Sequence, residues 1–128
     1  MVIAKLMMLM CVLMVGSLID AKPPTTYTVG DEFGWTLTID MGAWAKGKTF
    51  YAGDYLVFKY DEIYYNVVVD DKEGFDACIA SDNSTTYNDG YNKLQVVFGK
   101  NYFMCGHFVD CQAGMKMTID GKAPPPLL

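Results

Sequence analysis

The chain has 128 residues, which is enough for one domain with a single hydrophobic core and too few for two. Its ten basic residues are all lysine, against fifteen acidic residues, so the formal net charge is −5. Arginine, which binds phosphate through two parallel hydrogen bonds, is missing, and the overall field is negative. The composition therefore argues against a nucleic acid as partner.

The N-terminal segment has the pattern of a signal peptide. Lys5 precedes an apolar run over residues 6–15, and the small residues Gly16 and Ser17 come next. A membrane-spanning helix needs roughly 20 apolar residues, so this run is too short to be one, and no second run of this kind follows. We predict a signal peptide over residues 1–21, cleaved between positions 17 and 21, and a secreted extracellular chain with no transmembrane span.

Three cysteines follow the signal segment: Cys78, Cys105 and Cys111. The extracellular space is oxidising, and disulfides form and persist there. An odd number of cysteines predicts either one disulfide with one remaining thiol, or a bridge to another chain. The count leaves both alternatives open.

From Lys22 onward, short apolar runs alternate with polar residues at period two, which is typical of β-strands with one buried face. Turn-forming residues separate the runs at residues 53–54, 88–90 and 99–100. Residues 40–48 are expected to hold a helical turn. Seven strands are predicted, over residues 26–29, 35–39, 55–59, 66–69, 93–97, 101–104 and 115–119.

The last of these segments has the clearest alternation. Met115, Met117 and Ile119 are expected to face the core, with polar residues between them on the opposite face. Seven short strands separated by turns predict an all-β protein, a Greek-key sandwich or barrel. The domain is expected to cover residues 22–122. Residues 123–128 form a short proline-rich tail, briefer than the hydrophobic segment of a lipid-anchor signal.

Five segments carry a family resemblance. They are YTVGDEFGW at residues 27–35, FYAGDYLVF at 50–58, NVVV at 66–69, YFMC at 102–105 and CQAGMK at 111–116. In this order they resemble the phytocyanins, the plant blue-copper proteins, with the basic blue proteins or plantacyanins as the most similar subgroup. The resemblance implies a cupredoxin fold, a Greek-key β-sandwich with a copper site at one end, and this agrees with the predicted strands.

The resemblance also implies a position for each ligand of a type 1 copper ion, which is held by two histidines, a cysteine and a weak axial methionine. Cys105 and Met115 stand at the cysteine and methionine positions. Tyr65 stands at the first histidine position, and Asp110 stands at the second. Both histidine ligands are therefore expected to be replaced.

Such a donor set suits copper poorly. A phenol is mostly neutral at physiological pH and coordinates weakly, and a carboxylate is a hard donor that favours other metals than a soft thiolate does. The one histidine, His107, lies two residues after Cys105 and matches neither position, so it could join a copper site only in a rebuilt loop. We expect no cofactor, although the resemblance keeps copper as an alternative. Without a metal, Cys105 would be an inert core thiol and Met115 a core-facing strand residue.

The family pattern pairs Cys78 with Cys111 as a structural disulfide, which leaves Cys105 as the remaining thiol. On the chain-entropy model, closing this loop stabilises the fold by roughly 3 to 4 kcal/mol. Asn83 begins an Asn-Ser-Thr acceptor for N-glycosylation within a polar, loop-like segment, and we predict that it is modified.

Two functions are consistent with these residues. The first is a non-redox extracellular module, a monomer whose loops bind a cell-wall, glycan or protein partner; the loss of both histidines favours it. The second is a copper-binding electron-transfer protein with a remodelled site, which the retained Cys105 and Met115 favour. An enzyme is not expected, because Cys105 and His107 have no evident third group to orient them.

Overall fold

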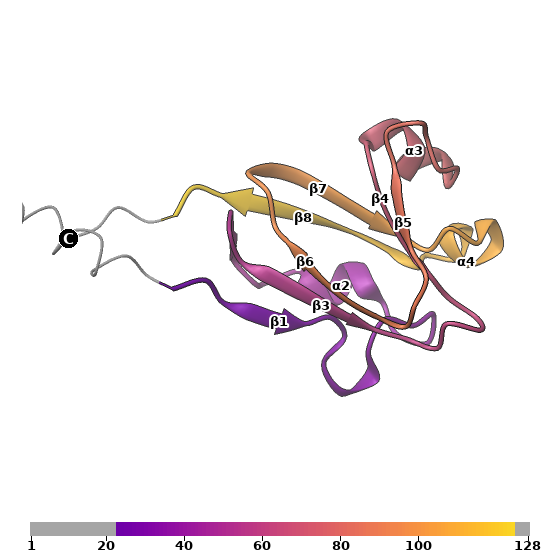
Figure 1. The fold of residues 1–128 in the computed structure, drawn as a ribbon, viewed down its shortest axis with the longest axis horizontal. Helices are drawn as coiled ribbons and strands as arrows, with labels where there is room; N and C mark the ends of the chain where they lie inside the picture. The colour runs from indigo at the N-terminus through magenta and orange to yellow at the C-terminus, as the bar shows by residue number, and fades with distance from the viewer. Residues whose placement is uncertain (1–22, 125–128) are drawn as a thin grey trace, which may run out of the picture.

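Two β-sheets packed face to face form the fold (Figure 1). The computed structural model describes residues 23–124, so the predicted signal peptide and residues 125–128 of the tail lie outside the described residues. One sheet has the order β1-β3-β6, and the other has the order β2-β8-β7-β4-β5. The first sheet contains β1 (Thr26–Thr28), β3 (Tyr55–Lys59) and β6 (Tyr91–Gln95), and the second contains β2 (Phe50–Tyr51), β4 (Val67–Asp70), β5 (Thr85–Tyr87), β7 (Gly99–Met104) and β8 (Lys116–Lys122).

The strand pairing confirms the predicted all-β sandwich. β1 pairs with β3 and β2 with β8 in parallel, and the remaining pairs are antiparallel. Residues 23–124 contain eight strands where about seven were predicted. The two strands that were not predicted, β2 and β5, have only two and three residues, which is too short for an alternation to be recognised.

One predicted strand is wrong. Residues 35–39 form bends and a turn between η1 (Asp31–Phe33) and α2 (Met41–Ala45). Trp35 is nevertheless buried. Its backbone N–H donates to Lys59 O at 2.8 Å, and its indole N–H donates to Asn66 O at 2.9 Å, so both polar groups are satisfied inside the protein. The alternating apolar residues of this segment therefore pack on the core although they belong to a loop. A loop of this kind gives the same apolar–polar alternation in the sequence as a strand.

A second correction concerns the strand predicted over residues 93–97. β6 begins and ends two residues earlier. Val96 donates its N–H to Asp54 O at 2.8 Å, and the N–H of Val97 donates to the side-chain oxygen of Asn101 at 3.0 Å. Val96 thus still bonds to the residues before β3, and the chain turns toward β7 at Val97.

Three short α-helices connect the strands. α2 lies inside the predicted segment 40–48, and the Asp40 side chain caps it by accepting from Ala43 N at 3.0 Å. α3 (Lys72–Ala77) and α4 (Phe108–Gln112) were not predicted, since one turn or two gives no helical periodicity. Both lie at the end of the sandwich opposite the start of β1 and the end of β8 (Figure 1). None of the helices in residues 23–124 has the length and hydrophobicity needed to cross a bilayer.

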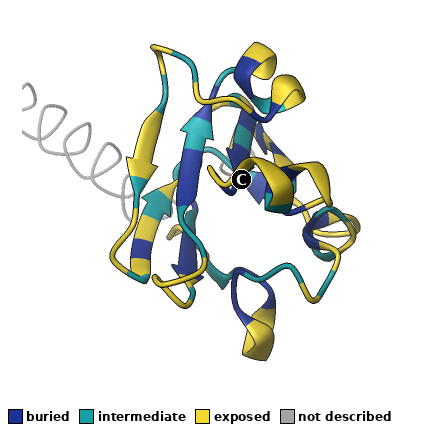
Figure 2. Cartoon of the chain, turned by 90° about the vertical axis from the view of Figure 1, so that its right-hand side faces the viewer, coloured by how far each residue is buried: buried dark blue, intermediate teal, exposed yellow. Residues whose placement is uncertain are grey.

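The core lies between the two sheets. The predicted alternation on β8 is confirmed, because Met115, Met117 and Ile119 are buried and the intervening side chains are not. Phe58 packs on the rings of Trp35 and Phe103, with both centroid distances at 5.2 Å. Figure 2 shows exposed positions on the helices, the connecting loops and the outer strands, with the buried positions gathered between them.

Candidate functional site

A single loop at the end of β7 carries most of the predicted site residues. Cys105 directly follows β7, and Met115 directly precedes β8. The Cys105 N–H donates to Met115 O at 3.0 Å, and the Met115 N–H donates to Asp110 O at 3.0 Å. These backbone bonds bring Cys105, Asp110 and Met115 together, although nine residues lie between the first and the last.

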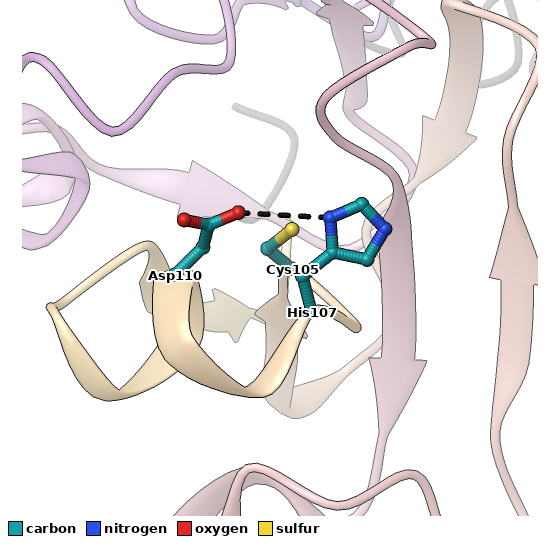
Figure 3. A group of neighbouring side chains, drawn as sticks. All are labelled: Cys105, His107 and Asp110. Carbon is teal, nitrogen blue, oxygen red and sulfur yellow. Dashed lines mark ion pairs between the residues drawn. The ribbon is translucent and has the colours of Figure 1, made fainter.

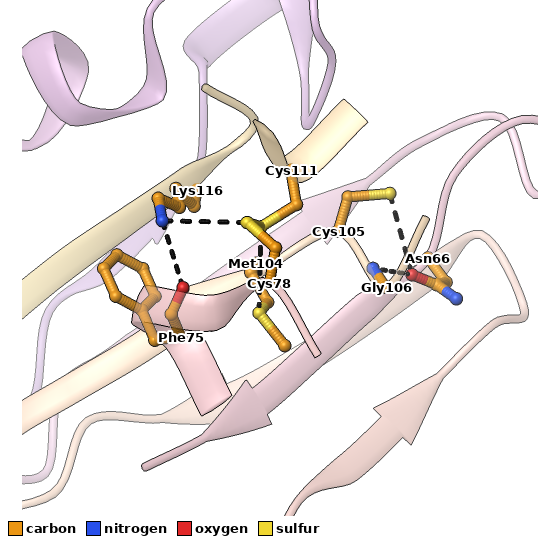
Figure 4. The surroundings of a disulfide bond; sticks show 8 residues. All are labelled: Asn66, Phe75, Cys78, Met104, Cys105, Gly106, Cys111 and Lys116. Carbon is orange, nitrogen blue, oxygen red and sulfur yellow. Dashed lines mark hydrogen bonds between the residues drawn. A yellow bond between two sulfur atoms is a disulfide. The ribbon is translucent and has the colours of Figure 1, made fainter. Parts of the chain in front are cut away.

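Cys105 is a free, fully buried cysteine. Its sulfur lies 3.7 Å from the side-chain oxygen of Asn66, and the N–H of Gly106 donates to the same oxygen at 2.6 Å (Figure 4). Burial raises the pKa of the Cys105 thiol above its ordinary value, and the neighbouring Asp110 carboxylate acts in the same direction. The thiol is therefore protonated at neutral pH in the metal-free protein.

His107 and Asp110 lie beside this thiol. His107 stands at the N-cap position of α4, where its side chain makes no capping hydrogen bond, and its Nδ1 is 3.6 Å from a carboxylate oxygen of Asp110, one helical turn further on. The histidine side chain is 49% exposed and the aspartate side chain 23% exposed. One ligand atom from each of Cys105, His107 and Asp110 lies within 4.8 Å of the other two, and the sulfur projects between the imidazole and the carboxylate (Figure 3).

Tyr65 and Met115 belong to the core beside the site. Met115 is fully buried in the same apolar cluster as Cys105, and Tyr65 packs on that cluster while partly exposed. Sequence reasoning did not assign His107 to the site, because it matches neither histidine position of the family pattern. Its type and its two-residue separation from Cys105 were the only signals that the sequence held.

The predicted disulfide is present. Cys78, which ends α3, is bonded to Cys111 of α4, with the two Cα atoms 5.7 Å apart. Lys116 reinforces this corner, because its Nζ donates to Phe75 O at 3.0 Å and lies 3.7 Å from the Cys78 sulfur (Figure 4). Since Cys111 follows Asp110 directly, the disulfide ties the α4 end of the site to α3.

Asn83, the predicted glycosylation site, lies in the loop between α3 and β5 and is exposed. Its side-chain amide donates to a carboxylate oxygen of Asp71 at 3.2 Å, and Asp71 in turn caps α3 by accepting from Gly74 N at 2.9 Å. The hydrogen bond that Gly74 donates is the main reason why the pKa of Asp71 is lowered. The acceptor is thus accessible, and its modification stays a prediction.

A groove of about 500 Å³ lies between α2 and β8, away from Cys105. Residues 23–124 hold eight lysines, and half of them line this groove. The charged lining consists of Lys46, Lys48, Lys116 and Lys122, with Asp120 as its one carboxylate. In a chain of net charge −5, this is a local concentration of positive charge.

Comparison with known proteins agrees with this architecture. A family model described as a plastocyanin-like domain matches residues 35–115. Early nodulin-like protein 22 of Arabidopsis thaliana is 41% identical over 124 residues, covering 95% of this chain and 88% of that protein. The blue copper protein of Petunia hybrida is 39% identical over 110 residues, covering 80% of this chain and 41% of that protein, so the chain spans less than half of this relative.

Two solved structures show the same fold. Cucumber basic protein, a blue copper protein, superposes with a TM-score of 0.71 at 36% identity, covering 76% of this chain and 99% of the other. Cucumber stellacyanin superposes with a TM-score of 0.68 at 32% identity, covering 80% and 99%. The two-sheet sandwich is therefore cupredoxin-like. Within that class, the chain belongs to the phytocyanin family.

Proposed function

We propose that this chain is a secreted, non-redox binding module built on the phytocyanin fold. The observation that carries the proposal is the donor set at the α4 end of the sandwich. A type 1 copper ion takes two imidazoles and a thiolate, with a weak axial thioether. The whole chain contains one histidine, so it can supply at most one imidazole. The apolar N-terminal run over residues 6–15 supports secretion.

The residues at the family's histidine positions support the same reading. Tyr65 offers a phenol, and Asp110 offers a carboxylate that lies 3.6 Å from the His107 imidazole. Cys105 and Met115 keep the sulfur ligands, but both are fully buried core residues and need no metal to explain their place. This donor set does not fit a type 1 copper ion, and we derive no electron transfer through one.

One observation favours the alternative, a copper-binding electron-transfer protein with a remodelled site. The His107 imidazole lies close to the Cys105 sulfur, so a copper ion there would have one imidazole and one thiolate. The second imidazole that a trigonal type 1 site needs would still be absent. The non-redox module is therefore the function that we favour.

We place the partner contact in the groove between α2 and β8. Four lysines and one aspartate line it, so an acidic partner is the complementary one. Two of the ammonium groups are already held in place, because Lys48 Nζ donates to Trp44 O at 2.9 Å and Lys116 Nζ donates to Phe75 O at 3.0 Å. An extracellular glycan that carries carboxylates, a polyuronate, fits this lining best.

Titration with Cu(II) tests the non-redox assignment. The full-length chain, expressed in a secreting host with its disulfide formed, should not develop the intense blue band of a type 1 copper site, whatever other copper it binds. A double variant, Tyr65→His with Asp110→His, restores imidazoles at both family positions and is expected to turn blue, because Cys105 and Met115 are already in place.

The double variant is the matched positive control for the titration. An intense blue band in the unmodified chain would contradict the proposal and favour the electron-transfer alternative. A colourless unmodified chain beside a blue double variant would attribute the loss of blue copper to the two replaced positions. If both proteins stayed colourless, the scaffold would have lost more of the site than its two imidazoles.

A further inference from the structure

We propose that Cys105, His107 and Asp110 together bind one Zn²⁺ ion. This goes beyond the non-redox module proposed above, which requires no metal, and it is compatible with that module because Zn²⁺ has no redox chemistry. The three residues come from eleven residues of chain that close one end of the sandwich, the loop from Cys105 to Met115.

The spacing of the donor atoms matches a tetrahedral zinc site. Zinc bonds of about 2.0 to 2.2 Å to nitrogen and oxygen and about 2.3 Å to sulfur place neighbouring donors roughly 3.4 to 3.6 Å apart. The imidazole Nδ1 of His107 and the carboxylate oxygen of Asp110 are 3.6 Å apart. All three ligand atoms lie within 4.8 Å of one another, so small side-chain movements bring them to the donor spacing of a tetrahedral site.

The chemistry of the three donors also selects zinc. Thiolate, imidazole and carboxylate range from soft to hard, and Zn²⁺ binds all three types without a geometric preference of its own. Calcium and magnesium ions require oxygen ligands throughout, and blue copper requires two imidazoles. When the ion binds, the Cys105 thiol forms a sulfur–zinc bond and releases its proton to solvent, so the zinc charge is balanced by one thiolate and one carboxylate.

The surrounding structure holds the ligands in position before any ion arrives. The backbone of Cys105 is bonded to Met115, the carbonyl of His107 accepts from Cys111 N at 3.0 Å, and the carbonyl of Asp110 accepts from Met115 N. Cys111 is itself fixed by the disulfide. The half-exposed His107 side chain faces solvent, which leaves a fourth coordination position open to water.

The competing explanation is an ordinary ion pair between His107 and Asp110 beside an inert core thiol. Titration with Co²⁺ separates the two, because tetrahedral Co²⁺ replaces Zn²⁺ and absorbs in the visible range, with a near-ultraviolet band when a thiolate is bound. The full-length disulfide-bonded chain, stripped with a chelator, should bind one Co²⁺ with a thiolate band, and one equivalent of Zn²⁺ should abolish that spectrum.

Three variants assign the ligands. Cys105→Ala should remove the thiolate band altogether. His107→Ala and Asp110→Asn alter partly exposed side chains and should each weaken Co²⁺ binding at least about tenfold. Even residues that only hydrogen-bond to a metal ligand change the metal affinity by that factor when they are replaced. The matched control is Asp120→Asn, which removes an exposed carboxylate on β8 and should bind Co²⁺ as the unmodified chain does.

Absence of a thiolate band in the unmodified chain would overturn the zinc site. Unchanged binding in both His107→Ala and Asp110→Asn would overturn it as well, because the ion would then sit elsewhere. Neither result touches the proposed non-redox function, which fails only if the unmodified chain forms blue copper. The Co²⁺ and Cu(II) experiments thus fail independently.

Discussion

At the scale of single residues, Cys105 has two possible roles and one environment. It is fully buried beneath His107, and its sulfur contacts the Asn66 side chain. Without a metal, burial keeps the thiol protonated, which makes it a small apolar core group. With a metal, the same position supplies a thiolate that oxidants dissolved in the solvent cannot reach readily.

This environment predicts slow thiol chemistry. In chelator, the folded chain should react with an aromatic disulfide reagent far more slowly than the unfolded chain, because burial both blocks access and raises the pKa of Cys105. The reaction should accelerate only at a pH above the range in which an ordinary cysteine reacts. The release of the coloured leaving group measures the rate.

Thr118→Cys provides the matched control for that experiment. Position 118 is exposed on β8, so the added thiol should react quickly in the folded state while Cys105 remains slow. Equal fast rates for both thiols in the folded double-thiol chain would show that Cys105 is accessible and that its burial is not maintained in solution.

At the scale of secondary-structure elements, one aspartate connects strands that lie far apart in the chain. Asp54 is 5% exposed and sits in the turn between β2 and β3. Its carboxylate accepts from Thr25 N and Tyr51 N, both at 2.9 Å, and its carbonyl accepts from Val96 N at 2.8 Å. The turn therefore links the start of β1, the end of β2 and the end of β6.

Asp54→Ala should lower the free energy of unfolding by about 2 to 3 kcal/mol, because two part-buried backbone N–H groups lose a carboxylate acceptor. Asp54→Asn keeps one acceptor oxygen, so its free energy of unfolding should lie between that of Asp54→Ala and that of the unmodified chain. Urea unfolding followed by tryptophan fluorescence measures both values. Asp120→Ala, on an exposed face, is the control and should change stability by no more than about 0.5 kcal/mol. A similar small change for Asp54→Ala would show that water replaces the carboxylate.

At the scale of the whole molecule, charge is unevenly distributed. The chain carries a net charge of −5, yet four lysines line the groove between α2 and β8. A negative molecule with a local basic groove can bind an anionic polymer only over that groove, and such binding is screened by salt.

The proposed glycan contact predicts how binding should depend on the salt concentration. Polygalacturonate should bind the folded chain at low ionic strength, and binding should weaken as salt rises, since the screening length falls from about 10 Å at 0.1 M to about 3 Å at 1 M. Lys46→Glu with Lys48→Glu should abolish it in an isothermal titration. An uncharged galactan should not bind.

Lys59→Glu with Lys100→Glu is the matched control, because it changes the net charge equally at two exposed positions outside the groove. Retained binding in this control beside lost binding in the groove variant would locate the contact. Equal loss in both would mean that overall charge matters and the groove does not.

Local patterns in the sequence predicted several elements closely. β3 occupies residues 55–59 as predicted, and the alternation of Met115, Met117 and Ile119 marks the buried face of β8. Such patterns are local because successive side chains of a strand point to opposite faces of the sheet, whatever the strand pairs with. The same alternation misled at residues 35–39, where Trp35 packs from a loop through bonds to Lys59 and Asn66.

The sequence by itself determined the sandwich, the single histidine and, through the family pattern, the pairing of Cys78 with Cys111. Only the tertiary structure placed His107 and Asp110 beside the Cys105 sulfur and gathered four lysines in one groove. The physical reason is that α4 is a single turn without a periodic signal, and its position depends on backbone bonds to Met115 and on the disulfide. Contacts between segments distant in the chain decide such juxtapositions, and no local pattern records them.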